Sequence, residues 1–334
     1  MSNYRKKYLT IDEQIELLKS RGMVINDHDY ASRLLSRVAY YRLSGYWYPQ
    51  RIITGGVRKD QFLPGTTLES IEAIYLFDKD LRIHVFKGIE IVEVALRAAL
   101  GNVIGKHGSM AHTDPTIFRT KFSGYDRSRG FYDPKSNKNN DSHQTTIDSL
   151  ARKTRRARHD FVQHIKDKYG LPLPVWVVTE VIDFSDLSKL YEGLLEEDQW
   201  NVVKKFNFED VLDKNPGGAS RKFVITLANW LEVLTFTRNS CAHHSRMWNA
   251  NFTRQISATK LLPAEVEHLS LTTDAQRARI YPALVVIACI IKRIEPNTSW
   301  HRELVTLMNK FAETGRNEGE MGFVDNWRTE SVWA

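Results

Sequence analysis

Apolar residues recur at spacings of three and four over several long stretches of the chain, which is the pattern of amphipathic helices. The longest stretch runs from a turn at Pro64-Gly65 to about Lys106. Thr66 and Glu69 have the spacing of an N-terminal capping box, and Gly88 indicates either a bend or the close approach of a second helix. We expect this helix to be the spine of the fold. Its apolar stripe consists of Ile71, Ile74, Leu81, Val85, Ile89, Val92, Leu96 and Val103.

Shorter helices are predicted on both sides of this spine. Thr10 and Glu13 form another capping box, and Gly55-Gly56 indicates a small hairpin within Arg51–Phe62. Gly108–Gln144 is rich in Gly, Ser, Asn, Asp and Lys, which is typical of a long polar loop. The fold class is therefore mainly α. The other helices are expected over about residues 10–22, 27–43, 152–170, 175–195, 275–293 and 298–313, besides a central one that begins near residue 227.

These elements suggest three parts. Residues 1–63 form an N-terminal helical module, and residues 64–250 form a helical bundle with a polar loop insertion at about 108–144. Residues 251–334 form a C-terminal helical extension with a tail. A chain of 334 residues with 42% hydrophobic residues is long enough to bury a core across such parts.

Composition adds a preference for polyanionic partners. The net charge is +7 and the pI is about 9.2. Cys241 and Cys289 are far apart in the sequence, so they predict neither a disulfide framework nor a metal site. We expect Cys241 to be a small buried thiol, and we expect no cofactor.

The chain is also expected to be cytoplasmic and to have no membrane partner. Its N-terminal residues contain no apolar signal core. The longest apolar run, Ile280–Ile291, is too short to span a bilayer and contains Pro282.

The stretch Leu227–Asn249 carries the candidate chemistry. Leu227, Leu231 and Leu234 predict a buried helix face, and four residues further along that face stands Arg238. Burying a bare charge is very costly, so the guanidinium must meet a cleft or an anionic partner. The stretch thus places a permanent cation at the end of an apolar face.

His243 and His244 follow Arg238 closely, and Asn239 is its neighbour. Imidazoles suit the acid and base steps by which an RNA 2′-OH attacks its own phosphate, because they exchange protons near neutral pH. An arginine fork can stabilise the charge that builds on the phosphoryl oxygens. No metal is needed. The competing interpretation is that these side chains only satisfy polar groups at a helix end.

The residues R-N-x-x-x-H-H-x-R-x-W-N from Arg238 onward resemble the active-site motif of HEPN ribonucleases, in the form carried by bacterial abortive-infection (Abi, AbiD/AbiF-like) proteins. Tyr40–Trp47, Ile89–Leu100, Leu173–Leu195 and Met321–Ala334 also look like family segments in family order. The resemblance implies a HEPN-like bundle and a metal-independent endoribonuclease. It also implies a homodimer in which two copies line one composite site.

On this resemblance the catalytic residues are Arg238, Asn239 and His243. Arg238 would stabilise phosphoryl charge, His243 would be the acid or base, and Asn239 would hold a phosphate oxygen or position Arg238. Supporting residues would be His244, Arg246 and Asn249. Apart from the resemblance, Glu90 and Glu93 lie on one side of the spine helix, and an acid there is expected to support the site by orienting Arg238 or a histidine. The two glutamates have an alternative role, since Glu93 and Arg97 have the spacing of an ordinary exposed ion pair.

A dense basic run at Arg152–Arg158 is the candidate RNA-binding segment. Its charges must repel one another on a helix unless counterions or phosphates neutralise them. A solvated helix face is the competing interpretation. The predicted RNA-binding residues are Arg152, Lys153, Arg155, Arg156 and Arg158.

The favoured function is therefore RNA cleavage by a toxin-like effector of anti-phage abortive infection. The alternative is a non-catalytic RNA-binding protein that holds a small regulatory RNA or guide in the same basic groove. The sequence by itself leaves both open.

Overall fold

The fold is mainly α, as predicted. The computed structural model describes residues 7–132, 142–213, 219–257 and 262–334, and it is 67% helical. The strands in these residues form two short antiparallel hairpins. Helices therefore make the core.

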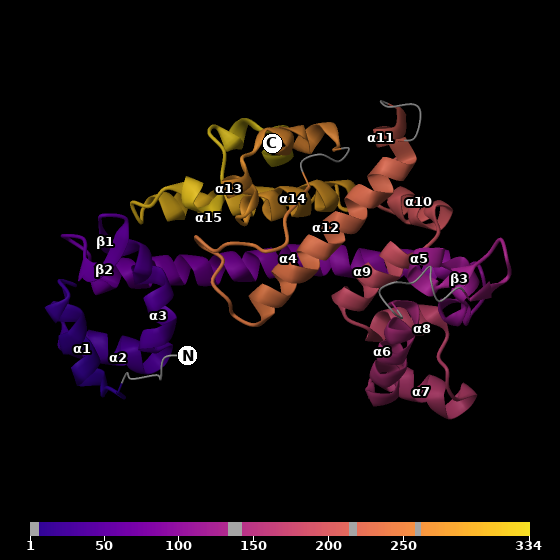
Figure 1. Ribbon diagram of the computed structural model, residues 1–334, viewed down its shortest axis with the longest axis horizontal. Helices are drawn as coiled ribbons and strands as arrows, with labels where there is room; N and C mark the ends of the chain where they lie inside the picture. Colours follow the sequence, from indigo (N-terminus) through magenta and orange to yellow (C-terminus); the bar gives the residue numbers. More distant parts are fainter. Residues whose placement is uncertain (1–6, 133–141, 214–218, 258–261) are drawn as a thin grey trace.

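One long helix, α4 (Leu68–Gly105), forms the axis of the molecule (Figure 1). Its 38 residues span about 57 Å. The predicted stripe is buried along its whole length, as expected. The N-cap is Thr67, whose side chain accepts from Ser70 N at 3.0 Å, so the predicted cap at Thr66 was wrong by one residue.

The N-terminal elements gather at one end of α4 (Figure 1). The Thr10–Glu13 capping box and the hairpin over Gly55-Gly56 are confirmed. The prediction of a single helix over residues 27–43 was wrong, because Ala39 takes a φ of 67° that no α-helix accommodates. The elements here are α1 (Ile11–Ser20), α2 (His28–Val38), α3 (Tyr40–Trp47), η1 (Tyr48–Gln50), β1 (Arg51–Thr54) and β2 (Val57–Phe62).

The middle of the chain packs at the other end of α4 (Figure 1). Within the predicted polar loop the structure forms short elements, and residues 133–141 lie outside the described part. The elements up to the next long helix are η2 (Ala111–Thr113), η3 (Pro115–Ile117), α5 (Thr120–Ser123), β3 (Tyr125–Asp126), β4 (Phe131–Tyr132), α6 (Ser142–Arg156), α7 (Asp160–Tyr169), α8 (Val175–Val181), α9 (Phe184–Gly193), α10 (Glu196–Lys205) and α11 (Asp210–Asp213).

Two predicted helices in this region are each divided in two. The helix expected to run to Gly170 breaks at residues 157–159, between α6 and α7. The helix expected over residues 175–195 breaks before α9, where the Asp183 side chain accepts from Asp186 N and starts a new helix. A side-chain cap inside an apolar pattern can thus end one helix and begin another.

The central helix α12 (Ala219–Ala242) crosses α4 obliquely, and the C-terminal helices run alongside α4 (Figure 1). Gly88 allows close approach, because a Cβ there would lie 2.6 Å from the Trp300 Nε1 atom. Trp327 and Trp333 of the tail are buried. The C-terminal elements are η4 (Ala264–Leu271), α13 (Asp274–Arg277), α14 (Tyr281–Ile294), α15 (Trp300–Ala312), η5 (Glu318–Met321), η6 (Trp327–Thr329) and η7 (Ser331–Trp333).

One cluster of buried apolar side chains runs through all three predicted parts of the chain. The two long helices after residue 250, α14 and α15, pack directly on α4. The predicted boundaries between the three parts, at residues 63 and 250, therefore stay a prediction from the sequence. What positions the candidate site is the crossing of α12 over α4.

Candidate active site at the end of α12

The C-terminal end of α12 closes with a Schellman motif built from the predicted site residues. Ser245 N donates to Ser240 O at 2.9 Å, and His244 N donates to Cys241 O at 3.0 Å. His244 takes a φ of 56°, a conformation in which glycine is usual. His243 is the C-cap residue, since its N–H still donates to Asn239 O. The sequence motif that begins at Arg238 therefore lies at a sharply terminated helix end.

Arg238 leans from α12 onto α4. Its side chain is 28% exposed, its Nε atom lies 3.7 Å from Glu93 Oε2, and its guanidinium carbon lies 5.6 Å from the centre of the Phe86 ring. Nε is buried and makes no hydrogen bond among the described residues. The sequence-based expectation that Arg238 meets an anionic partner is confirmed, and the partner is Glu93.

Glu93 connects this arginine to a second one. Its carboxylate also pairs with Arg97, whose guanidinium donates in turn to Thr179 O on α8. Glu93 is thus a bridge between two cations rather than one half of an exposed ion pair. Glu90 does not bridge these cations, and its side chain is exposed on α4. A supporting role for either glutamate in catalysis stays a prediction.

Asn239 and His243 are both exposed, one helical turn apart. Asn239 Oδ1 accepts from Arg238 at 3.5 Å, which is at the long limit of a hydrogen bond. Arg238 and His243 are five residues apart, which places them about 140° apart around the helix. Within one copy, therefore, the arginine faces α4 and the imidazole faces away from it.

The segment that follows α12 is anchored by Asp78, a fully buried carboxylate on α4. Asp78 accepts from the backbone amides of Met247, at 3.0 Å, and Trp248, at 2.6 Å. It also accepts from Tyr46 Oη at 2.6 Å and pairs with Arg82. This carboxylate therefore ties α3, α4 and the end of the motif together.

Asp78 was not predicted from the sequence, although a signal was present. Asp78 and Arg82 are four residues apart, and both lie close to the apolar stripe of the spine helix. An acid and a base at that spacing on a buried face predict a paired, desolvated site.

Two of the supporting residues predicted in this segment, Arg246 and His244, contact the N-terminal module. The Arg246 guanidinium donates to Gly45 O, and its guanidinium carbon lies 5.8 Å from the centre of the Trp248 ring. Burial lowers the pKa of Arg246. His244 O accepts from Arg42 at 2.7 Å, and Asn249 adopts a φ of 48°. These residues hold the end of α12 against α3.

Cys241 is a buried thiol, as predicted. Burial, with a further contribution from the charge of Asp78, raises the pKa of Cys241 to about 12. The thiol therefore stays protonated at neutral pH and packs as an apolar group.

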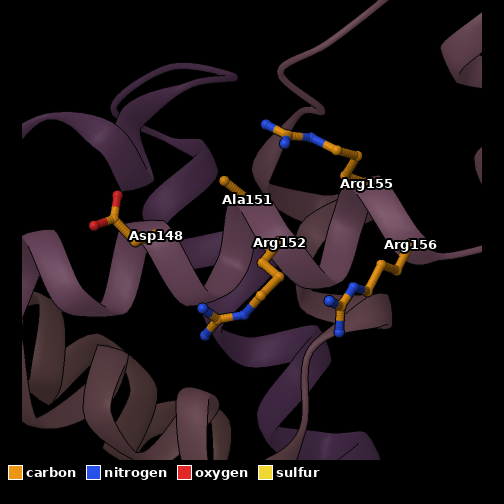
Figure 2. A pocket seen from close by; sticks show the side chains of 5 residues that line it. All are labelled: Asp148, Ala151, Arg152, Arg155 and Arg156. Atoms are coloured by element: carbon orange, nitrogen blue, oxygen red, sulfur yellow. The ribbon is translucent and has the colours of Figure 1, made fainter.

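A second cluster of candidate residues lies on α6, which is at the far end of α4. We define the α6 arginine cluster as Arg152, Arg155 and Arg156, which line a surface hollow of about 390 Å³ together with Asp148 and Ala151 (Figure 2). All three are exposed and form no ion pair with a carboxylate of the described residues. In Figure 2, Arg152 and Arg156 extend to the same side of the helix, and Arg155 leaves it on the other side.

Two residues of the predicted basic run do not belong to this cluster. Lys153 pairs with Asp183 and Asp186 of the α9 N-terminus, and its assignment to RNA binding stays a prediction. Its ammonium is neutralised by two carboxylates of the chain itself. Arg158 is exposed but lies beyond the end of α6, between the two helices.

The described residues provide neither a metal site nor a membrane-spanning helix. No group of three or more His, Cys, Asp or Glu side chains there is arranged to hold a metal ion. None of the helices in the same residues combines the length and hydrophobicity that a membrane crossing needs.

Comparison with known proteins gives one match. The sequence matches the family described as Abi-like protein over residues 33–249, which is more than half of the chain. No curated protein and no solved structure matches it. The matched segment begins in α2 and ends at the last residue of the motif, so it contains Asp78, Glu93, Arg238 and His243.

Proposed function

Because the chain belongs to the Abi-like protein family, we propose that it acts in abortive infection as a metal-independent endoribonuclease of the HEPN type. The family supports the role in abortive infection. The observation that carries the ribonuclease proposal is the setting of Arg238. Its guanidinium is held by Glu93 and Phe86 and is still partly exposed, and the exposed His243 follows five residues later at the same helix end.

In the proposed reaction a base removes the proton of an RNA 2′-OH, and the oxygen attacks the adjacent phosphorus. The bond from phosphorus to the 5′-oxygen breaks, and an acid protonates that oxygen. The products are a 2′,3′-cyclic phosphate and a 5′-OH. Arg238 stabilises the charge on the phosphoryl oxygens, and His243 exchanges a proton.

We further propose that two copies share the reaction. One imidazole cannot act as base and acid in the same step, and Arg238 and His243 of one copy point about 140° apart. An exposed, mostly apolar stripe on α4 borders Arg238 and suits a self-complementary contact between two copies. The stripe contains Ile83, Phe86, Glu90 and Val94, with Ile83 59% and Val94 54% exposed.

Cleavage of a labelled single-stranded RNA tests the enzymatic proposal. Arg238→Ala and His243→Ala are each expected to lower the rate by about 100-fold or more, the scale on which such groups act. Arg254→Ala is a matched control, because Arg254 is an exposed arginine after the end of α12 that pairs with Glu232 of that helix. Equal activity of the Arg238 and Arg254 variants would refute the assignment.

Mixing inactive variants tests the shared site. If Arg238 of one copy acts with His243 of the other, heterodimers of the Arg238→Ala and His243→Ala variants contain one intact site and regain activity. A mixture that stays inactive, although subunit exchange is demonstrated, would show that each copy supplies both residues. Val94→Asp is expected to reduce dimerisation and cleavage together, whereas Leu271→Asp, at a highly exposed position on η4, changes neither.

The non-catalytic alternative is favoured by one observation, the α6 arginine cluster, which lies apart from the motif and suits a phosphate backbone. RNA that is bound by the wild type and by the Arg238 and His243 variants alike, and cut by none of them, would establish this alternative.

A further inference from the structure

A groove between α4 and α8 lies next to the candidate site. It encloses about 430 Å³ and is bordered by Arg97, Asn102, Lys106, Trp176 and Glu180. Its wall on α8 is the indole of Trp176, which is 51% exposed. A large aromatic side chain so exposed beside a concave surface is a feature of ligand-contacting surfaces.

The groove owes its shape to two glycines of α4. A Cβ at Gly101 would lie 3.1 Å from Thr179 Oγ1, so this glycine lets α8 approach α4 closely. A Cβ at Gly105 would lie 3.5 Å from Trp176 Cε3, so the indole stands directly over a residue without a side chain. One side of the ring packs against the helix, and half of the side chain remains free.

The groove is connected to Arg238 through a continuous chain of contacts. Arg97, which borders the groove, pairs with Glu93, and Glu93 lies 3.7 Å from Arg238. Glu93 and Gly101 are eight residues apart, a distance of about 12 Å along the helix axis. A single strand bound with a phosphate at Arg238 therefore reaches the groove within a few nucleotides.

The chemistry of the groove favours a base over a phosphate. Arg97 pairs with Glu93, and the carboxylate of Glu180 borders the groove together with the exposed Lys106. Two acidic side chains therefore oppose the two cations at the groove, which weakens its attraction for an anion. A flat, neutral ring can stack on Trp176, and the Asn102 amide, which donates to Ala98 O at 2.8 Å, keeps an oxygen for a base edge.

We infer that this groove is a base-binding subsite, in which Trp176 stacks on one nucleobase of a single-stranded RNA whose phosphate lies at Arg238. The inference rests on the proposed ribonuclease function. It assigns to Trp176 the role of fixing the register of the strand relative to the cleaved phosphate.

The test measures binding of a 2′-O-methyl RNA of mixed sequence, which lacks the attacking hydroxyl, and of the same strand with one base removed at successive positions. For the wild type, removal of one particular base is expected to weaken binding by about 5- to 100-fold. Trp176→Ala is expected to weaken binding of the complete strand by a similar factor and to abolish that dependence on position. Trp176→Phe retains a smaller ring, and its affinity for the complete strand is expected to lie between those of the wild type and Trp176→Ala.

Tyr8→Ala is the control, because Tyr8 is an exposed aromatic residue of the N-terminal region. Unchanged affinity of Trp176→Ala, in a protein that still cuts RNA, would overturn the subsite and leave the ribonuclease proposal standing. A loss of dimerisation without a change in the affinity per dimer would assign the groove to a protein contact and also overturn it. Failure of the wild type to bind or cut any RNA would overturn both proposals.

Discussion

Replacing Asp78 with alanine is expected to destabilise the fold strongly. The carboxylate accepts from the Tyr46 hydroxyl, from Arg82 and from the amides of Met247 and Trp248, and its side chain is fully buried. Alanine removes every one of these acceptor contacts at once. Arg82 then loses its counterion, and its side chain is almost fully buried, so the charge is left in the interior without a partner carboxylate.

Removal of one partner from a buried ion pair costs about 3 to 5 kcal/mol. The unfolding entropy is roughly 2.1 cal/mol/K per residue, so for 334 residues this corresponds to a fall in Tm of about 4 to 7 °C. Asp78→Asn keeps the shape but loses the charge, and its effect is expected to be smaller, because its carbonyl oxygen still accepts one hydrogen bond.

Thermal and guanidinium unfolding measure this difference. Asp80→Ala is the matched control, because Asp80 is exposed on the same helix, and it is expected to change the free energy of unfolding by at most about 0.5 kcal/mol. If Asp78→Ala is no more destabilising than Asp80→Ala, the carboxylate is not the anchor described here. Well below its melting temperature, Asp78→Ala is also expected to cut RNA more slowly, because the segment after α12 loses its attachment.

Three further predictions concern other groups. Burial lowers the pKa values of His84 and His112 to about 4. The unfolded protein therefore binds more protons than the folded protein between about pH 6.5 and 4, and the free energy of unfolding is expected to fall by on the order of 3 kcal/mol per histidine as the pH drops through this range. Unfolding free energies measured across the range test this, and a flat profile would contradict it. The thiol of Cys241 is expected to react with a thiol reagent only after unfolding, and rapid reaction of the native protein would refute its protonated, buried state. Replacing the α6 arginine cluster with alanines is expected to weaken binding of unrelated RNAs and to reduce the salt dependence of binding. The Lys153→Ala control is expected to leave the salt slope unchanged, because the Lys153 ammonium is already paired. An unchanged slope for both variants would assign the cluster to a solvated helix face.

The sequence predicted the elements whose signals are strong and local. The spine helix, the Thr10–Glu13 capping box, the hairpin and the close approach at Gly88 were all expected from periodicity or turn residues. The errors occurred where a local feature interrupts an apolar pattern. Ala39 and Asp183 each end a predicted helix, the first by its backbone conformation and the second by capping.

Part of the candidate site could also be predicted. A cation at the end of an apolar stripe must find a partner, and the structure supplies Glu93. The two glutamates of the spine helix were named from the sequence, but the crossing of α12 over α4 decides that Glu93, not Glu90, meets the arginine. Sequence spacing does not encode that crossing. The same limit applies to Asp78, whose acceptors are occupied by residues about 170 positions away, and to Lys153, whose partners lie on α9.

The central claim is that Arg238 and His243 cut RNA by attack of its own 2′-OH. The most direct measurement is incubation of the wild-type protein with a labelled RNA in EDTA, with analysis of the new ends and with a second substrate that carries a single 2′-deoxynucleotide at the cleavage position. The account predicts cleavage in EDTA, a 5′-OH and a 2′,3′-cyclic phosphate, and no cleavage at the deoxy position. A strict requirement for added magnesium, 5′-phosphate ends, or cleavage at the deoxy position would contradict it.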